Sequence, residues 1–233
     1  MTAASVVGLV PARGGSRGIP RKNLALLAGR PLIEYTIECA RSSRTLDRLV
    51  VSTDDGEIAE VARRAGAEVP FIRPAALAAD ETPMLDVALH ALEEIGSCDV
   101  LVVLQPTSPL RRPEHVDEAV ELLLATNADA VVGVVDVPHR YSPDSLMVLE
   151  GDRLVPAVGS PPARRQDKPR LFARNGPAVL VLRAAGLRAR GDLYGGDCRA
   201  YLMDARSSLD VDDPLDLELA DCLLERAERE ALS

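Results

Sequence analysis

The chain has 233 residues, of which 47% are hydrophobic, and a formal net charge of -9 at pH 7. This length and apolar content suit one large α/β domain, while the negative charge argues against binding to nucleic acids or anionic membranes, whose phosphates it would repel. No apolar stretch approaches the roughly 18 residues needed to span a bilayer, and the pattern of a secretory signal is not recognised at the N-terminus. We therefore expect a cytoplasmic protein.

The first predicted element is a buried strand, Val6–Pro11, followed by a basic, glycine-rich loop. The first 33 residues contain no acidic side chain but carry five basic ones, Arg13, Arg17, Arg21, Lys22 and Arg30. A strand that ends in such a loop commonly presents backbone amides and cations to a phosphate. The loop therefore predicts an anion site, with a glycine-rich turn carrying solvated arginines as the alternative.

This loop matches neither common phosphate-binding motif. A Walker A loop would need Gly followed by Lys where Ile19 or Pro20 stands. The dinucleotide pattern GxGxxG cannot be drawn through Gly14, Gly15 and Gly18. We therefore expect neither a P-loop ATPase nor a dinucleotide-binding protein.

Apolar segments rich in Val and Leu then alternate with amphipathic segments, which is the pattern of βα units around a mostly parallel sheet. The further predicted strands are Arg48–Ser52, Val69–Ile72, Val100–Leu104, Ala130–Val135, Ala178–Leu182 and Ala200–Met203. The predicted helices, four of which have Pro near the first turn, are Pro31–Arg41, Glu57–Ala65, Pro83–Ile95, Pro113–Ala125 and Pro214–Glu230. We predict a doubly wound α/β sheet in a single domain covering residues 1–233.

The segment Pro138–Lys168 does not follow this alternation. It holds five prolines in a polar stretch with little periodicity, which indicates an excursion from the sheet.

Ligands of open α/β sheets bind beyond the carboxyl ends of the strands, and polar residues follow the first four predicted strands. The basic loop follows the first strand, Ser52–Asp55 the second, Arg73-Pro74 the third and Gln105–Arg111 the fourth. We expect all of them at one rim. Asp54 and Asp55 are interpreted first as structural, with Asp55 starting a helix, and a second set of metal ligands is the alternative.

An acidic pair, Asp210 and Asp212, lies near the other end of the chain. In an extended segment alternate side chains point the same way, so the two carboxylates could share a hard divalent cation, for which Mg²⁺ is the natural candidate. Without a cation or hydrogen-bond donors they would repel each other. Asp213, just before Pro214, is expected to cap the last helix.

Other reactive residues carry weaker signals. The four cysteines, Cys39, Cys98, Cys198 and Cys222, form no CxxC pair and have no His at metal-ligand spacing, so we expect free thiols and no zinc site. His90 lies in a predicted helix among apolar residues, and we expect it to be packed or surface-exposed. His115 and His139 have no Ser or Cys partner that the sequence identifies, which leaves a hydrolase triad without support. The basic run Arg164–Arg174 is interpreted equally as a solvated face or as a contact for a sugar carboxylate or pyrophosphate.

Taken in order, these motifs resemble the acylneuraminate cytidylyltransferase family, the CMP-sialic acid synthetases. The resemblance covers almost the whole chain and is carried by seven segments: Pro11–Pro20 with Lys22-Asn23, Val51–Asp55, Arg73-Pro74, Leu104–Arg111, Arg165-Gln166, Asn175-Gly176 and Asp210–Asp212. It implies a Rossmann-like nucleotidyltransferase fold. It also implies transfer of CMP from CTP to the anomeric hydroxyl of a nonulosonic, sialic-type acid, with release of pyrophosphate.

The resemblance further implies roles for individual residues. The implied nucleotide-binding residues are Ala12, Arg13, Gly14, Ser16, Arg17, Lys22, Asn23 and Arg73. Arg13 and Lys22 would hold the triphosphate, and Arg73 would help to fix the cytosine. Asp210 and Asp212 would carry Mg²⁺ and complete the catalytic set with Arg13 and Lys22. The implied acceptor-binding residues are Gln105, Thr107, Ser108, Arg165, Gln166 and Asn175.

In this family a partner subunit contributes to the acceptor pocket, which implies a homodimer with contacts from the excursion at about residues 138–175 and from the segment around Leu193-Tyr194. The chain departs from many relatives at Arg17, where they have Lys, and after Asn175-Gly176, where they often have Ala and then an aromatic residue. The second departure leaves an eight-carbon ulosonic acid or a phosphonate as an alternative acceptor. A non-catalytic CTP sensor is a further alternative, against which the retained acidic pair argues.

Overall fold

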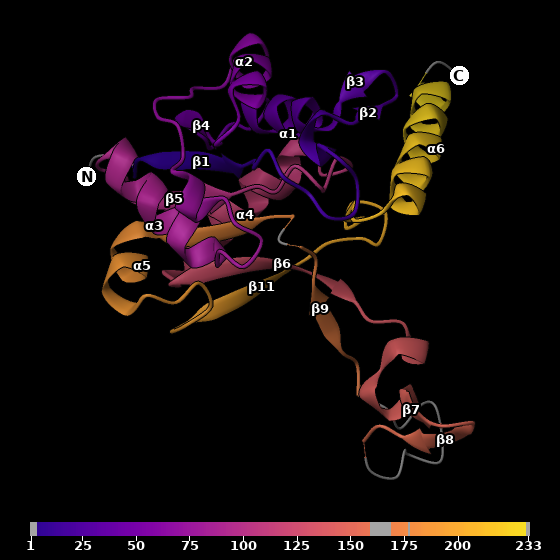
Figure 1. Ribbon diagram of the computed structural model, residues 1–233. Coiled ribbons are helices and arrows are strands. Elements are labelled where there is room, and N and C mark those ends of the chain that lie inside the picture. Colours follow the sequence, from indigo (N-terminus) through magenta and orange to yellow (C-terminus); the bar gives the residue numbers. More distant parts are fainter. Residues whose placement is uncertain (1–3, 159–168, 177, 232–233) are drawn as a thin grey trace.

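The computed structural model describes residues 4–158, 169–176 and 178–231, and its centre is a seven-stranded, mostly parallel sheet (Figure 1). Five strands run parallel, in the spatial order β4 (Arg48–Ser52), β1 (Val6–Pro11), β5 (Val100–Val103), β6 (Ala130–Asp136) and β11 (Cys198–Leu202). Antiparallel β10 (Leu180–Arg183) lies between β5 and β6, and β9 (Phe172–Arg174) pairs with the end of β6. The parallel strands end at one edge, where the candidate site lies.

Helices cover both faces of this sheet, which confirms the predicted doubly wound α/β fold. On β1, Val6 and Val10 pack into one apolar layer and Val7 and Leu9 into the other. The first layer is completed by α1 (Leu32–Arg41), α2 (Gly56–Arg64) and α4 (Pro113–Thr126), and the second by α3 (Met84–Ile95) and α5 (Ala184–Arg190). Strands buried on both faces are hydrophobic without alternation, as β1 and β5 are. Within the described residues, no helix combines the length and the hydropathy that a membrane span requires.

The predicted strand Val69–Ile72 is wrong. Only an isolated bridge between Val50 and Glu68 extends the sheet there, because Pro70 and Pro74 lack the N–H that a strand ladder needs. Each of the other predicted strands and helices is present, with bounds within two residues of those expected. The short helix α5 and strand β9 were not predicted.

Between β6 and β9 the chain leaves the sheet and forms an arm that projects from the body (Figure 1). In the described part of this arm, β7 (Met147–Glu150) and β8 (Arg153–Pro156) pair as an antiparallel hairpin. Most side chains of the two strands are exposed. The hairpin in the described part of the arm therefore has almost no core of its own.

The last helix, α6 (Pro214–Ala231), stands beside the small hairpin of β2 (Leu26–Leu27) and β3 (Arg30–Pro31) (Figure 1). A third apolar cluster joins them and consists of Ile19, Leu27, Leu32, Val211 and Ala220. Asp213 caps α6 as predicted, because its Oδ1 accepts hydrogen bonds from the backbone N–H groups of Leu215 and Asp216, at 2.8 and 3.0 Å. This packing holds the acidic segment before α6 against the loop after β1.

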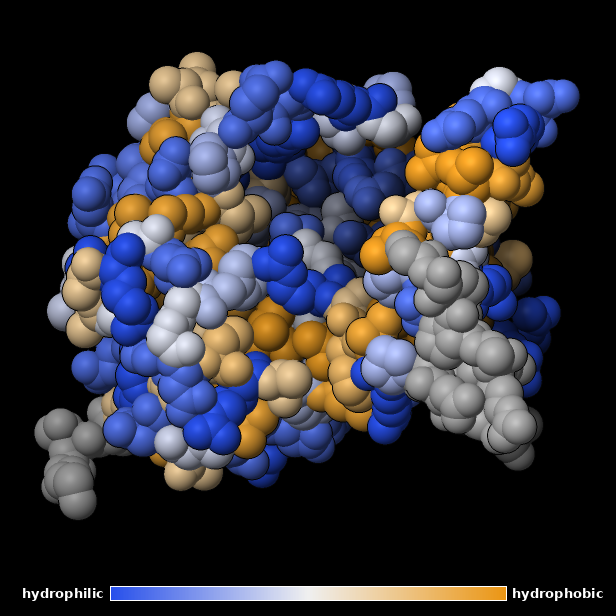
Figure 2. All heavy atoms as spheres, turned by 90° about the horizontal axis from the view of Figure 1, so that it is seen from below, coloured by the Kyte–Doolittle hydropathy of each residue, from blue (hydrophilic) through white to orange (hydrophobic). Residues whose placement is uncertain are grey.

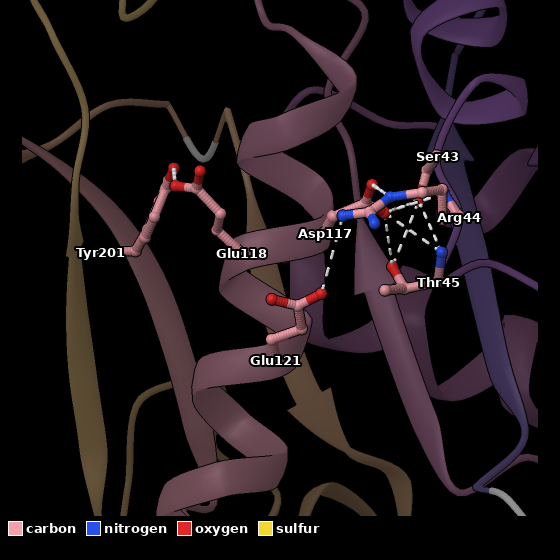
Figure 3. Close-up of polar contacts among 7 residues, drawn as sticks. All are labelled: Ser43, Arg44, Thr45, Asp117, Glu118, Glu121 and Tyr201. Carbon is pink, nitrogen blue, oxygen red and sulfur yellow. Dashed lines mark hydrogen bonds and ion pairs between the residues drawn. The ribbon is translucent and has the colours of Figure 1, made fainter.

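A buried carboxylate on α4 fixes the connection between α1 and β4 (Figure 3). Asp117 Oδ1 accepts hydrogen bonds from Ser43 Oγ at 2.6 Å, Arg44 N at 2.9 Å and Thr45 Oγ1 at 3.0 Å, and Asp117 Oδ2 accepts one from Arg44 Nε at 3.1 Å. On the next position of α4, Glu118 accepts a hydrogen bond of 2.5 Å from the hydroxyl of Tyr201 on β11. Side chains of α4 thus anchor the loop before β4 and the distant strand β11.

We expect Asp117→Asn to lower the free energy of unfolding by about 2 kcal/mol at pH 7, because hydrogen bonds to a buried charge are lost. Burial alone would raise the pKa of Asp117, but the hydrogen bonds from Ser43, Thr45 and Arg44 outweigh it and lower the pKa. The stabilisation is therefore present above the unfolded-state pKa and is lost as the pH falls through the lower folded-state pKa.

Urea unfolding at several pH values would measure both effects. The control is Glu121→Gln, since Glu121 is exposed and lies 3.8 Å from Arg44, so that less than about 1 kcal/mol is expected from its loss. Equal stability of the Asp117→Asn variant and the wild type would contradict the role given to Asp117.

Candidate active site

The loop after β1 is shaped by close contacts with acidic segments. Gly14 N donates a hydrogen bond of 2.9 Å to Asp54 Oδ1. A Cβ on Gly14 would lie 2.9 Å from Asp55 Oδ2, and one on Gly18 would lie 2.1 Å from the backbone oxygen of Asp212. Gly18 must therefore be glycine because the close atom is backbone, and a Cβ on Gly14 would displace the Asp55 side chain, so both glycines serve the packing of the loop rather than the approach of a phosphate. Gly15, whose Cβ would meet no atom within 4 Å, remains free for that purpose.

A cleft of about 380 Å³ opens between this loop and the other strand ends. Many of the predicted site residues line it, namely Arg13, Ser16, Arg17, Lys22, Asn23, Arg73, Gln105, Thr107 and Asp212. Ala12 is fully buried and, like Gly14, does not line the cleft. Asn23 also closes the base of the loop, because its Nδ2 donates a hydrogen bond of 2.8 Å to the backbone oxygen of Arg13. One cleft thus collects residues from both ends of the chain.

Two acidic residues that the sequence analysis missed lie against the cations of the cleft. Arg13 Nη1 is 2.5 Å from Asp80 Oδ1, and Arg17 pairs with Asp80 and, at 3.2 Å, with Glu81. Hydrogen bonds from Arg17 and then Arg13 hold the pKa of Asp80 below its ordinary value. Asp80 lies in the connection between Arg73 and α3, where no strand ends, so the rule that residues beyond strand ends line the site does not indicate it.

Lys22 links the basic loop directly to the acidic segment. Its Nζ donates hydrogen bonds to the backbone oxygen of Val211 at 2.8 Å and to Asp212 Oδ1 at 2.9 Å. The Lys22 side chain is 15% exposed, whereas that of Asp212 is 75% exposed. Lys22 is therefore held in place by the protein while the Asp212 carboxylate remains accessible from the cleft.

Asp210 differs from Asp212 in its surroundings. The pKa of Asp210 is raised, mainly by burial. The hydrogen bond with Thr107 lowers this pKa and the negative charge of Asp212 raises it, but both effects are smaller than that of burial. Its Oδ1 is buried and has no hydrogen-bond partner among the described residues. A carboxylate oxygen in that state favours a cation. Mg²⁺ commonly takes one or two carboxylates and completes its shell with water and phosphate oxygens, and of this pair Asp212 lines the cleft whereas Asp210 does not.

Arg73 is buried, and its guanidinium is held by the protein. Nε donates to Ser52 Oγ at 3.0 Å, Nη1 donates to the backbone oxygen of Leu77 at 3.4 Å, and Nη2 donates to the backbone oxygen of Ser52. Burial lowers the pKa of Arg73 to about 10. The side chain therefore shapes the wall of the cleft, and its direct contact with a base stays a prediction.

The predicted acceptor-binding residues divide into two groups. Gln105 and Thr107 line the cleft and are linked by a hydrogen bond of 3.3 Å from Thr107 Oγ1 to Gln105 Oε1. Ser108 and Asn175 are buried and do not line the cleft, and Asn175 Nδ2 donates a hydrogen bond of 2.9 Å to Ser208 Oγ. Arg165 and Gln166 lie outside the described residues.

Several residues outside the cleft have structural roles. Asp55 caps α2 by accepting hydrogen bonds from the backbone of Glu57 and Ile58, at 2.8 and 3.1 Å, which confirms its interpretation as a helix start. His90 packs edge-on against Phe71, and Nδ1 of His115 accepts a hydrogen bond from the backbone of Arg112. The four cysteines form no disulfide.

Comparison with known proteins identifies relatives along nearly the whole chain. The family model described as cytidylyltransferase matches residues 7–184. The chain is 32% identical over 225 residues to CMP-N,N'-diacetyllegionaminic acid synthase of Legionella pneumophila, and this alignment covers 94% of the chain and 96% of the synthase. It is 35% identical over 219 residues to N-acylneuraminate cytidylyltransferase A of Danio rerio, covering 93% of this chain and 50% of that protein.

Among solved structures, CMP:2-keto-3-deoxy-manno-octonic acid synthetase complexed with CTP has the same fold. The TM-score is 0.76 at 19% sequence identity, and the similarity covers 96% of this chain and 100% of that one.

Proposed function

Because this chain belongs to the cytidylyltransferase family, we propose that it transfers CMP from CTP to the anomeric hydroxyl of a nonulosonic acid and releases pyrophosphate. The chain is an enzyme, a nucleotidyltransferase. The observation that carries the proposal is the cleft, where a basic loop, Arg73 and Asp212 converge. The use of CTP also leads us to propose a cytoplasmic location.

In this reaction the anomeric oxygen forms a bond to the α-phosphorus. The bond between that phosphorus and the oxygen bridging to the β-phosphate breaks, pyrophosphate leaves, and the hydroxyl proton is released. The protein contributes mainly orientation and stabilisation of phosphate charge. In our proposal Arg13 and Lys22 neutralise the triphosphate and the departing pyrophosphate, and the amides near Gly15 and Ser16 bind its oxygens.

We further propose that Asp210 and Asp212 hold Mg²⁺. Support comes from the buried Oδ1 of Asp210, which has no hydrogen-bond partner among the described residues, and from the exposure of the Asp212 carboxylate at the cleft. When bound there, Mg²⁺ supplies positive charge to phosphate oxygens and lowers the pKa of the attacking hydroxyl.

The acceptor is expected at Gln105 and Thr107, which line the cleft together with the basic loop. Ser108 and Asn175 would support this part of the cleft from within the protein, since both are buried.

The function is tested by pyrophosphate release with Mg²⁺, using each of the four common nucleoside triphosphates with a panel of acceptors. The panel contains sialic, legionaminic and pseudaminic acids, an eight-carbon ulosonic acid and simple phosphonates. CTP-dependent release with a nine-carbon acid is expected. Release only with the eight-carbon acid or a phosphonate would replace the acceptor that we propose. Tight CTP binding without release would indicate a nucleotide sensor.

Asp80→Asn is expected to tighten CTP binding by about two- to fivefold, since Asp80 competes with the triphosphate for Arg13 and Arg17 and exposed ion pairs of this kind are weak. Isothermal titration calorimetry at fixed ionic strength would measure the dissociation constant. The matched control is Glu68→Gln. Glu68 lies away from the cleft, and its Oε2 is 2.8 Å from Arg48 Nη2, so the substitution also removes a carboxylate that is paired with an arginine. Weaker CTP binding in the Asp80→Asn variant would show that Asp80 supports the nucleotide rather than competing with it.

We also propose that the arm mediates homodimerisation. Its hydrophobic side chains are unusually exposed, namely Leu146, Met147, Val148, Leu149 and Leu154, and Figure 2 shows hydrophobic atoms on the part that projects from the body at the right. An isolated two-stranded hairpin is marginally stable in water, so a second copy is its expected partner. Sedimentation equilibrium should give twice the chain mass of 24.9 kDa.

A further inference from the structure

Arg111, at the end of the acceptor-side segment Gln105–Arg111, is a buried arginine. It is 3% exposed and forms no ion pair with a carboxylate among the described residues. Burial lowers its pKa, and the nearby titratable group is the thiol of Cys39. A buried charge without a counter-charge is costly, and apolar residues of similar size commonly stabilise a core better. Stability alone therefore does not explain an arginine here.

The guanidinium joins three separate segments of the chain. Nη1 donates hydrogen bonds to the backbone oxygen of Ala178 at 2.7 Å and to that of Gln105 at 3.2 Å. Nη2 donates a hydrogen bond of 2.7 Å to Thr36 Oγ1, which in turn donates one of 3.3 Å to the backbone oxygen of Gln105. Only the planar fork of arginine can serve diverging acceptors in this way, since a lysine presents a single point charge.

Both loop segments held by Arg111 also contact the acidic segment. Thr107, two residues after Gln105, accepts a hydrogen bond of 2.7 Å from the backbone N–H of Val211. On the other side, Ala178 N donates a hydrogen bond of 2.8 Å to the backbone oxygen of Asn175, and a Cβ on Gly176 would lie 2.9 Å from Asp210 Oδ2. A shift of either segment would therefore move the surroundings of Asp210.

We propose that Arg111 is the positioning residue for the acceptor side of the site. It fixes the carbonyl oxygens of Gln105 and Ala178, and through them the cleft-lining side chains of Gln105 and Thr107 and the place of Asp210. It does not touch the nucleotide loop. The expected effect on acceptor kinetics rests on the proposed function. The expected effect on the rigidity of the segments at Gln105 and Ala178 rests on the structure alone.

The test compares Arg111→Met and Arg111→Lys with Arg112→Lys. Arg112 is the adjacent arginine, and its side chain is 62% exposed. Arg111→Met should raise the KM for the acceptor by at least about tenfold, because small misplacements of binding groups have large effects, with the KM for CTP unchanged within about twofold. Arg111→Lys should be intermediate, and Arg112→Lys should behave as wild type. Hydrogen exchange in Arg111→Met should be faster at residues 105–111 and 178–180 and unchanged at residues 12–23.

Unchanged acceptor KM and unchanged exchange in a folded Arg111→Met variant would overturn the inference, as would a parallel loss of CTP and acceptor binding. If Arg111→Met does not fold, Thr36→Val takes its place, because it removes the hydroxyl that joins Arg111 to Gln105 and should give the same selective effect at smaller size. If the wild type turns over none of the acceptors tested, the proposed function fails, and the exchange comparison still decides whether Arg111 positions these segments.

Discussion

Asp210→Asn is expected to lower kcat by about a thousandfold with the fold intact, since a metal-based contribution of several kcal/mol to the transition state would be lost. The substitution keeps the size of the side chain and the hydrogen bond with Thr107, but it removes the negative charge of a buried carboxylate whose Oδ1 has no hydrogen-bond partner among the described residues. Pyrophosphate release over a series of Mg²⁺ concentrations measures the effect. CTP binding without added metal should be nearly unchanged.

The control for this prediction is Asp213→Ala in the same segment. Asp213 caps α6, so the variant should lose about 1 kcal/mol of unfolding free energy and keep the kcat of the wild type. Asp210→Asn is thus expected to lower kcat and leave stability unchanged, whereas Asp213→Ala is expected to lower stability and leave kcat unchanged. Wild-type turnover in the Asp210→Asn variant would remove Asp210 from the metal site.

The architecture was predictable because the central strands are buried on both faces. Segments such as Val100–Val103 are apolar at every position, which indicates a central strand without knowledge of its neighbours. Val69–Ile72 satisfied the same composition rule, but Pro70 within it and Pro74 after it lack the N–H that a strand ladder needs. The antiparallel direction of β10 could not be predicted, since the direction of a strand depends on the path of the chain before it.

Membership of the rim was predictable for several segments, but the direction of individual side chains was not. Gln105, Thr107 and Ser108 are close together in one loop, yet the first two line the cleft and Ser108 is buried. Local sequence does not determine which way a loop side chain points when distant segments form its surroundings. In the same way, Asp80 meets Arg13 and Arg17 from more than sixty residues away, and nothing in the local pattern of either segment indicates this pairing.

Buried charges were the least predictable feature. Arg111 has the appearance of a surface residue in the sequence, because arginine is rarely buried without a partner. Besides the Thr36 hydroxyl, its partners are the backbone carbonyl oxygens of Gln105 and Ala178. Every residue carries such an oxygen, and no sequence pattern distinguishes these two. Sites built from carbonyl acceptors are therefore found only in the structure.

Lys22→Ala is expected to lower kcat/KM for CTP by about a hundred- to a thousandfold, the range measured when one preorganised donor to a developing charge is removed. Lys22 neutralises the triphosphate in our proposal, and its Nζ also fixes the acidic segment through the backbone oxygen of Val211 and through Asp212. Both the phosphate contact and the place of the Asp212 carboxylate would be lost. Steady-state kinetics with varied CTP at saturating acceptor measures the change.

Arg21→Gly is the matched control, because it removes a positive charge one position away. Arg21 has a φ of 51°, a conformation that glycine adopts without strain, and its guanidinium pairs with Asp55 and Glu57 rather than with residues of the cleft. If general positive charge near the loop were enough, both variants would lose CTP affinity equally. If the geometry of Lys22 matters, Arg21→Gly keeps kcat/KM within about threefold, since exposed ion pairs contribute little, and only Lys22→Ala shows the large loss. Equal losses would therefore contradict the specific role of Lys22 and leave only the net charge of the loop as the source of nucleotide binding.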